Sequence, residues 1–105
     1  MANDIVREGK FISITGINAD LSFDRIFQRD TDIKIKRIEF AAVTDDDFII
    51  IREKTITGSP ICQLGVLTNI PDRCYFHDGG QYMQPCIDFS EATLTAGHLL
   101  IFELG

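Results

Sequence analysis

Apolar residues occur along the chain in short runs that are rich in β-branched and aromatic side chains. Turn-forming residues such as Asn18, Asp45, Gly58 and Gly79 separate these runs. The expected strands cover residues 11–17, 33–43, 48–53, 61–67, 73–77, 82–89 and 98–104. Short strands that recur about every 8–12 residues are typical of a sandwich or a barrel. The pattern therefore predicts an all-β fold, a small antiparallel β-sandwich of the jelly-roll or immunoglobulin-like type.

Residues 20–29 are the one segment that would suit a short helix, since they contain Leu21, Phe23, Ile26 and Phe27. The same residues would also suit an extended arm, and both alternatives stay open at this point. No linker, low-complexity tract or internal repeat interrupts the chain. We therefore expect residues 11–105 to form a single domain with at most one short helix.

The predicted strand over residues 33–43 changes its apolar face part-way along. Ile33 and Ile35 share one parity, whereas Ile38 and Phe40 share the other. A period of two that slips by one residue indicates a β-bulge or a bend, here at Lys36 and the residue after it. In a small sandwich such a bend allows a strand to pass from one sheet toward the other.

Two predicted strands, residues 48–53 and 99–104, carry apolar side chains on both faces. A two-layer sandwich has one core, so one face of each strand should meet water. Covering an Ile or Leu is worth about 1.5–3 kcal/mol, so several of them are not expected to stay exposed. A loop, the segment 20–29 or a second subunit would cover the surplus faces. The candidate interface residues are Phe11, Ile49, Ile51, Leu99 and Ile101.

The first ten residues are mostly polar. Residues 1–10 are therefore predicted to form a flexible N-terminal arm that orders on a partner. They lack the apolar core of a signal peptide, so we expect the protein to be made and kept in a cytosol. No run approaches the ~20 apolar residues of a membrane helix.

Charge and cysteine content narrow the expected partners and compartment. The 105 residues include 16 acidic and 10 basic side chains, which give a formal net charge of −6. Nucleic acid is not an expected partner because phosphate neutralisation requires a positive surface, and an anionic membrane surface is disfavoured for the same reason. The three cysteines are an odd number, which argues for reduced thiols rather than a disulfide framework.

Cys74, His77 and Cys86 raise the question of zinc or of a cysteine nucleophile. A structural zinc site requires four ligands, and strand residues three positions apart point to opposite faces. A nucleophilic cysteine requires a histidine within hydrogen-bond reach, and the chain offers only His77 and His98. Small buried cysteines and a histidine at a strand end are therefore the expected reading.

The acidic residues are also expected to be structural. The run at 45–47 lacks the ligand spacing of a calcium loop and is typical of a solvated turn. Asp78, Asp88 and Glu91 would suit glycoside hydrolysis only if two of them flanked a cleft. We therefore expect no catalytic residue, no metal and no cofactor, and a protein that is not an enzyme.

Aromatic and amide side chains gather between residues 73 and 84. Tyr75, His77, Tyr82 and Gln84 would suit a small carbohydrate- or peptide-binding module, and this remains an alternative function.

The order of several segments resembles small phage-encoded β-sandwich proteins, and the resemblance covers about residues 33–104. The segments are 33–43, 48–53, 58–61, 85–89, 92–97 and 100–104, of which the last three read PCIDF, ATLTAG and LIFEL. Many proteins of this kind end in a P-Y-I-D…T-L-x-A-G…I-F-E-L phrase, and Cys86 stands where an aromatic residue would be expected. The resemblance carries no catalytic motif.

This resemblance implies a structural protein of a bacteriophage particle, of the capsid decoration or cement type. Such a protein would form a symmetric homo-oligomer, for example a trimer, and would bind a major capsid or other virion protein on the outside of the shell. It would be localised to the virion after synthesis in the host cytoplasm. A tail or baseplate accessory protein is the alternative within the same resemblance.

Overall fold

The computed structural model describes residues 4–17, 19–28, 31–42, 47–65, 72–76, 79–94 and 97–105. The strands in this part of the chain are β1 (Asp4–Glu8), β2 (Phe11–Thr15), β3 (Ile33–Ala41), β4 (Phe48–Glu53), β5 (Pro60–Gly65), β6 (Asp72–Tyr75), β7 (Gln81–Met83), β8 (Pro85–Ile87) and β9 (Leu99–Leu104). The helices are α1 (Phe23–Phe27) and the 3-10 helix η1 (Phe89–Glu91).

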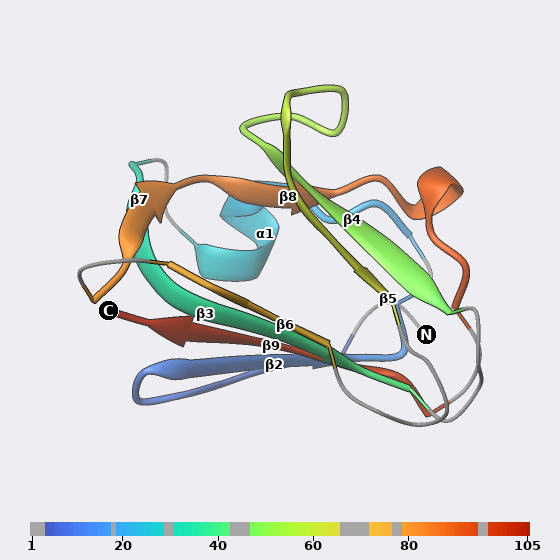
Figure 1. Ribbon diagram of the computed structural model, residues 1–105, viewed down its shortest axis with the longest axis horizontal. Helices are drawn as coiled ribbons and strands as arrows, with labels where there is room; N and C mark the ends of the chain where they lie inside the picture. Colours follow the sequence, from blue (N-terminus) through green and yellow to red (C-terminus); the bar gives the residue numbers. More distant parts are fainter. Residues whose placement is uncertain are drawn as a thin grey trace.

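The strands form two antiparallel sheets, which confirms the predicted all-β sandwich. Sheet A has the order β1-β2-β9-β3-β6, and β7 also pairs with β3. Sheet B has the order β5-β4-β8. Figure 1 shows sheet A as the lower layer, sheet B above it and α1 between them. The chain therefore buries one continuous apolar core between two layers.

The bulge predicted in β3 is confirmed. Pairing with β9 shifts its register between Ile35 and Arg37. Ile35 before the shift and Ile38 after it are both fully buried, so the extra residue keeps the apolar side chains on the core side. The strand does not cross to the other sheet as expected. It stays in sheet A and changes its second neighbour from β7 to β6.

Residues 23–27 are helical, so the extended alternative for this segment is wrong over that range. Phe27 packs its ring edge against Phe102 of β9, with the centroids 5.3 Å apart. Ile26 is fully buried in the same core. The helix thus fills the space where the two sheets diverge. Among the described residues, no helix is long and apolar enough to cross a bilayer.

The first strand corrects the expectation of a flexible arm over residues 1–10. Residues 4–8 form β1, which pairs along its whole length with β2, whereas residues 1–3 lie outside the described residues. Gly9 takes a φ of 59° and closes a two-residue hairpin turn, as glycine does at this position. Hydrogen bonds link this strand to α1, because the Arg7 guanidinium donates to the carbonyl oxygens of Arg25 and Ile26 at 2.8–3.0 Å. The last carbonyl groups of a helix generally lack an intrahelical partner, and the Arg7 guanidinium supplies hydrogen bonds to two of them here.

Candidate functional site

Sheet A packs one face on the core, and no described helix or strand lies over its other face, which we call the outer face (Figure 1). Pairing aligns outward side chains in three rows across five strands. The rows are Asp4-Thr15-Leu99-Ala41, Val6-Ser13-Ile101-Glu39-Arg73 and Glu8-Phe11-Glu103-Arg37-Tyr75. The strands therefore build a broad surface from side chains that are distant in the sequence.

The large apolar side chains that remain exposed are concentrated on the outer face. Among the described residues they are Val6, Phe11, Tyr75 and Tyr82, with exposed fractions of 51%, 44%, 67% and 66%. The first three belong to the rows above. Tyr82 pairs with Lys34, whose neighbours on β3 face inward, so Tyr82 also points outward. Exposed apolar side chains gathered on one face are typical of a contact surface.

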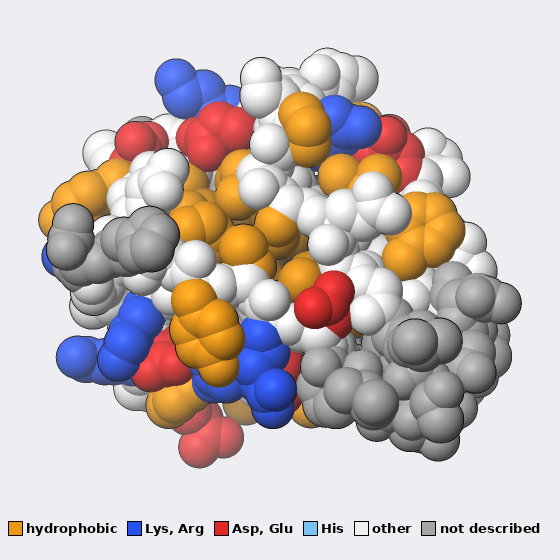
Figure 2. Space-filling model, viewed as in Figure 1, with side chains coloured by type: hydrophobic (Ala, Val, Ile, Leu, Met, Phe, Trp, Pro, Cys, Tyr) orange, Lys and Arg blue, Asp and Glu red, His pale blue; other side chains and the backbone are white. Residues whose placement is uncertain are grey.

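An ion-pair network occupies the centre of this face. Arg37 binds Glu103 through Nε at 3.0 Å and Glu39 through Nη1 at 2.6 Å. Arg73 reaches the same Glu39 oxygen at 3.0 Å, and Lys36 Nζ lies 3.8 Å from Glu103. Along the lower edge of Figure 2, below β6, charged side chains of both signs are interleaved with apolar ones. Because these charges are already paired, a partner could cover them without burying an isolated charge.

Three of the five candidate interface residues lie on the outer face. Phe11 is 44% exposed, and Leu99 and Ile101 are half-buried. In the pairing register, Ile101 lies between Ser13 of β2 and Glu39 of β3. These three side chains therefore lie on the face of sheet A that points away from the core, and their role in contact stays a prediction.

Ile49 and Ile51 require a correction, because both are fully buried in the core of the single chain. The neighbouring Phe48 and Ile50 are the half-buried pair on the opposite face of β4. The assignment of faces was therefore reversed on this strand. Four successive apolar residues carry no alternation, so the periodicity could not distinguish the two faces.

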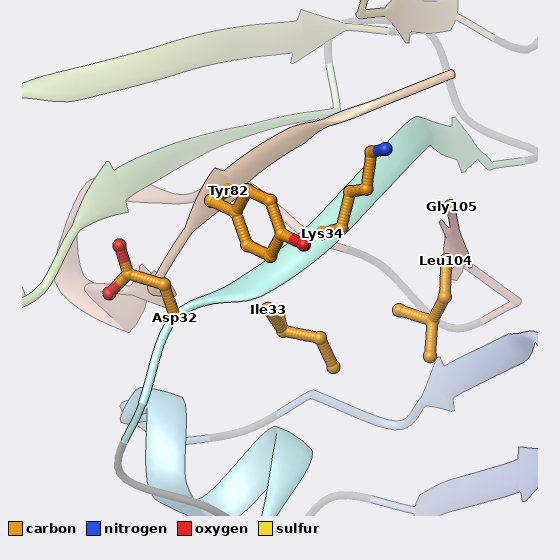
Figure 3. A pocket seen from close by; sticks show the side chains of 6 residues that line it. All are labelled: Asp32, Ile33, Lys34, Tyr82, Leu104 and Gly105. Carbon is orange, nitrogen blue, oxygen red and sulfur yellow. The ribbon is translucent and has the colours of Figure 1, made fainter.

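A pocket of about 310 Å³ opens beside the outer face, lined by Asp32, Ile33, Lys34, Tyr82, Leu104 and Gly105. Figure 3 shows Lys34 and Tyr82 on neighbouring strands, with Asp32 and Leu104 toward opposite ends of the site. The Lys34 ammonium lies 6.0 Å from the centroid of the Tyr82 ring. Gln84 Nε2 donates to Asp32 Oδ1 at 2.8 Å and so orients that carboxylate. The pocket combines an aromatic surface, a cation and an oriented acceptor.

The residues predicted for carbohydrate or peptide binding are only partly brought together. Tyr82 lines the pocket, and Gln84 reaches it through Asp32. Tyr75 belongs to β6 and points outward beside Arg37, its pairing partner on β3, so it does not line the pocket. His77 lies outside the described residues.

The residues weighed for zinc or nucleophilic chemistry occupy structural positions where they are described. Cys86 is buried and its Sγ donates to the Arg52 carbonyl oxygen at 3.4 Å. Burial raises the pKa of its thiol to about 11, with the Glu53 charge adding to the effect. Buried His98 accepts the Ile17 N–H at Nε2, at 2.9 Å. Within the described residues, no three His, Cys, Asp or Glu side chains gather as a metal site.

The acidic candidates serve the turn around η1. Asp88 Oδ1 accepts hydrogen bonds from the Ser90 N–H at 2.9 Å and the Ser90 hydroxyl at 2.6 Å, and these bonds lower its pKa. Glu91 forms a two-pronged ion pair with Arg52, at 2.8 and 2.6 Å, which lowers the pKa of Glu91. The general acid in glycoside hydrolysis requires a raised pKa, whereas the pKa values of Asp88 and Glu91 are both lowered. These two carboxylates therefore do not fit that chemistry. Asp45, Asp46 and Asp78 lie outside the described residues.

We expect the Arg52–Glu91 pair to make stability depend on acidity below about pH 4.5. The folded-state pKa of Glu91 is lower than its ordinary value of 4.5, so its contribution is present at neutral pH and is lost as the pH falls through the folded-state pKa. Urea unfolding of wild type and Glu91→Gln should therefore differ at pH 7 and converge toward pH 3. Arg52→Lys should behave similarly, because lysine lacks the planar fork. A difference that stays constant over this range would contradict the assignment.

Comparisons of the chain with protein-family models, with curated proteins and with solved structures find no match.

Proposed function

We propose that this chain is a non-enzymatic structural protein that assembles with copies of itself through the outer face of sheet A. The observation that carries the proposal is the concentration of exposed apolar side chains on that face, Phe11 and Val6 among them. In a chain that functioned alone in water, polar residues at such positions would increase solubility.

The charges of the outer face favour a second copy of the chain as the occupant. The whole protein has a net charge of −6, so two copies repel one another at most approaches. The central network instead joins Lys36, Arg37 and Arg73 with Glu39 and Glu103. A surface that carries both signs can be complementary to itself around a symmetry axis. Contact at this face therefore avoids most of the repulsion.

The phage particle is the proposed setting, and its support is the resemblance of residues 33–104 to phage-encoded β-sandwich proteins. In that setting the chain is a capsid decoration or cement protein that braces the shell, with a major capsid protein as its second partner. Capsid, portal or tail genes beside the gene for this chain would agree with this setting.

Light scattering after size-exclusion chromatography tests the self-association. We expect a mass of two or more times that of one chain, and we expect this mass to persist on dilution to micromolar concentration. A strict monomer over the full concentration range would overturn the self-association. Failure to bind phage heads or tails would overturn the proposed phage setting.

The pocket beside Tyr82 supports a second candidate function, a small carbohydrate- or peptide-binding module. An exposed ring next to an oriented carboxylate and an ammonium group suits a ligand with both apolar and polar edges. A glycan array and a peptide array, probed with wild type and with Tyr82→Ala, test it. We expect any specific signal to fall at least about tenfold in Tyr82→Ala, the loss of one stacking contact. The absence of wild-type signal on both arrays would remove this candidate.

A further inference from the structure

Two cysteines from different sheets face the same part of the core. Cys62 of β5 pairs with Ile51 of β4, which is fully buried, so its side chain points inward from sheet B. Cys74 of β6 pairs with Ile38 of β3, also fully buried, so its side chain points inward from sheet A. Both are half-buried and pack against the common core.

The two strands that carry these cysteines lie along the same side of the sandwich. Figure 1 shows β5 and β6 together at the front of the molecule, and Cα atoms of the two strands approach within 8 Å. The Gly65 N–H at the end of β5 donates to Asp72 Oδ2 at the start of β6, at 3.1 Å. An inter-sheet disulfide requires inward side chains on neighbouring strands, with the two Cα atoms about 4.4–6.8 Å apart.

We propose that Cys62 and Cys74 form an oxidisable dithiol that closes into a disulfide between sheets A and B. The oxidant is a small-molecule disulfide such as oxidised glutathione. One cysteine thiolate attacks it, which forms a mixed disulfide and releases one molecule of reduced thiol. The second cysteine then loses its proton, attacks the protein sulfur and releases the second molecule of reduced thiol. The two protons that leave the protein thiols protonate the two thiolates released from the oxidant, so the products are one protein disulfide and two small-molecule thiols.

The environment of Cys62 determines how readily the pair reacts. Burial raises the pKa of the Cys62 thiol, and the adjacent Cys74 raises it further. Because the thiolate is the reacting form, we expect the oxidation rate to rise with pH above neutrality. The third cysteine, Cys86, lies on β8, at the opposite edge of sheet B from β5. It therefore takes no part in the proposed disulfide.

Oxidation of a Cys86→Ser variant tests the proposal, since only the two proposed cysteines then remain. Serine retains a hydroxyl that can donate to the Arg52 carbonyl oxygen, as the Cys86 thiol does. After incubation of the native protein with oxidised glutathione, we expect the intact mass to fall by two hydrogen atoms. Trypsin cleaves after Arg73, so the disulfide should join a peptide that contains Cys62 to one that contains Cys74. The closed form should also have a higher urea midpoint, which dithiothreitol reverses.

The matched variants Cys62→Ser/Cys86→Ser and Cys74→Ser/Cys86→Ser should form no internal disulfide and should gain only bound glutathione. Two free thiols that persist in Cys86→Ser at pH 9, or a cross-link that forms only in denaturant, would overturn the proposal. Cross-links only between chains would overturn it as well. In the phage setting the pair would stay reduced in the host cytosol and close after release. The timing of closure rests on the proposed function, whereas formation of the disulfide does not. The disulfide proposal and the proposed function can therefore fail independently of one another.

Discussion

Replacement of Ile51 by alanine is expected to lower the free energy of unfolding by about 2–5 kcal/mol, which is the range for a large buried aliphatic side chain. Ile51 is fully buried and pairs with Cys62 on one side and Ile87 on the other. Truncation leaves a cavity that these strands cannot close, because their backbone ladders fix their spacing. Since small domains are stable by only about 5–15 kcal/mol, a large part of the stability would be lost. Urea titration followed by circular dichroism gives the value.

Ile50→Ala is the matched control, because it removes the same atoms from the next residue of the same strand. Ile50 is only half-buried and faces away from the core, so we expect less than about half of the effect. The comparison separates the two possible roles of β4. If Ile51 were an interface residue, Ile51→Ala would dissociate the oligomer and leave the stability of each chain unchanged. If Ile51 is a core residue, Ile51→Ala lowers the stability of the chain itself. Equal effects of the two substitutions would contradict the assignment of faces.

The fold could be predicted from the sequence wherever periodicity and turn chemistry agree. The parity change around Lys36 is an example, since only a bulge keeps both halves of β3 on the core side. The N-terminal strand was missed for a physical reason. Edge strands carry charged residues that discourage pairing with other chains, so Arg7 and Glu8 made β1 resemble a solvated arm. The turn at Gly9 was the available signal, because it precedes an apolar strand.

The outer face, which is the proposed contact surface, could be predicted only in part. Phe11, Leu99 and Ile101 could be identified because surplus apolar side chains need a cover. The charged centre of the surface could not, because Arg37 and Glu103 are 66 residues apart and become neighbours only through the pairing of β3 with β9. The inter-sheet cysteines depend in the same way on tertiary structure. Strand order brings such residues together, and local patterns of apolar and turn residues do not reveal strand order.

A double substitution, Val6→Asp and Phe11→Asp, is expected to weaken self-association at least about 100-fold, while the chain stays folded. An unpaired carboxylate buried in a desolvated contact costs roughly 3–5 kcal/mol, which corresponds to this change in the dissociation constant. Both side chains are about half exposed in the single chain, so their loss creates no cavity in the core. Light scattering across a dilution series measures the dissociation constant, and circular dichroism with a melting curve confirms the fold.

The control substitution, Thr57→Asp with Gln63→Asp, adds the same charge elsewhere. Both residues are exposed, and Gln63 lies on β5 of sheet B rather than on the outer face of sheet A. General repulsion between more acidic chains would weaken association equally in both variants, and this effect would fade with added salt. A specific contact through the outer face predicts that only the first variant dissociates, and that salt does not restore it. Equal behaviour of the two variants would therefore reject the outer face as the interface, and would leave charge alone as the cause of any dissociation.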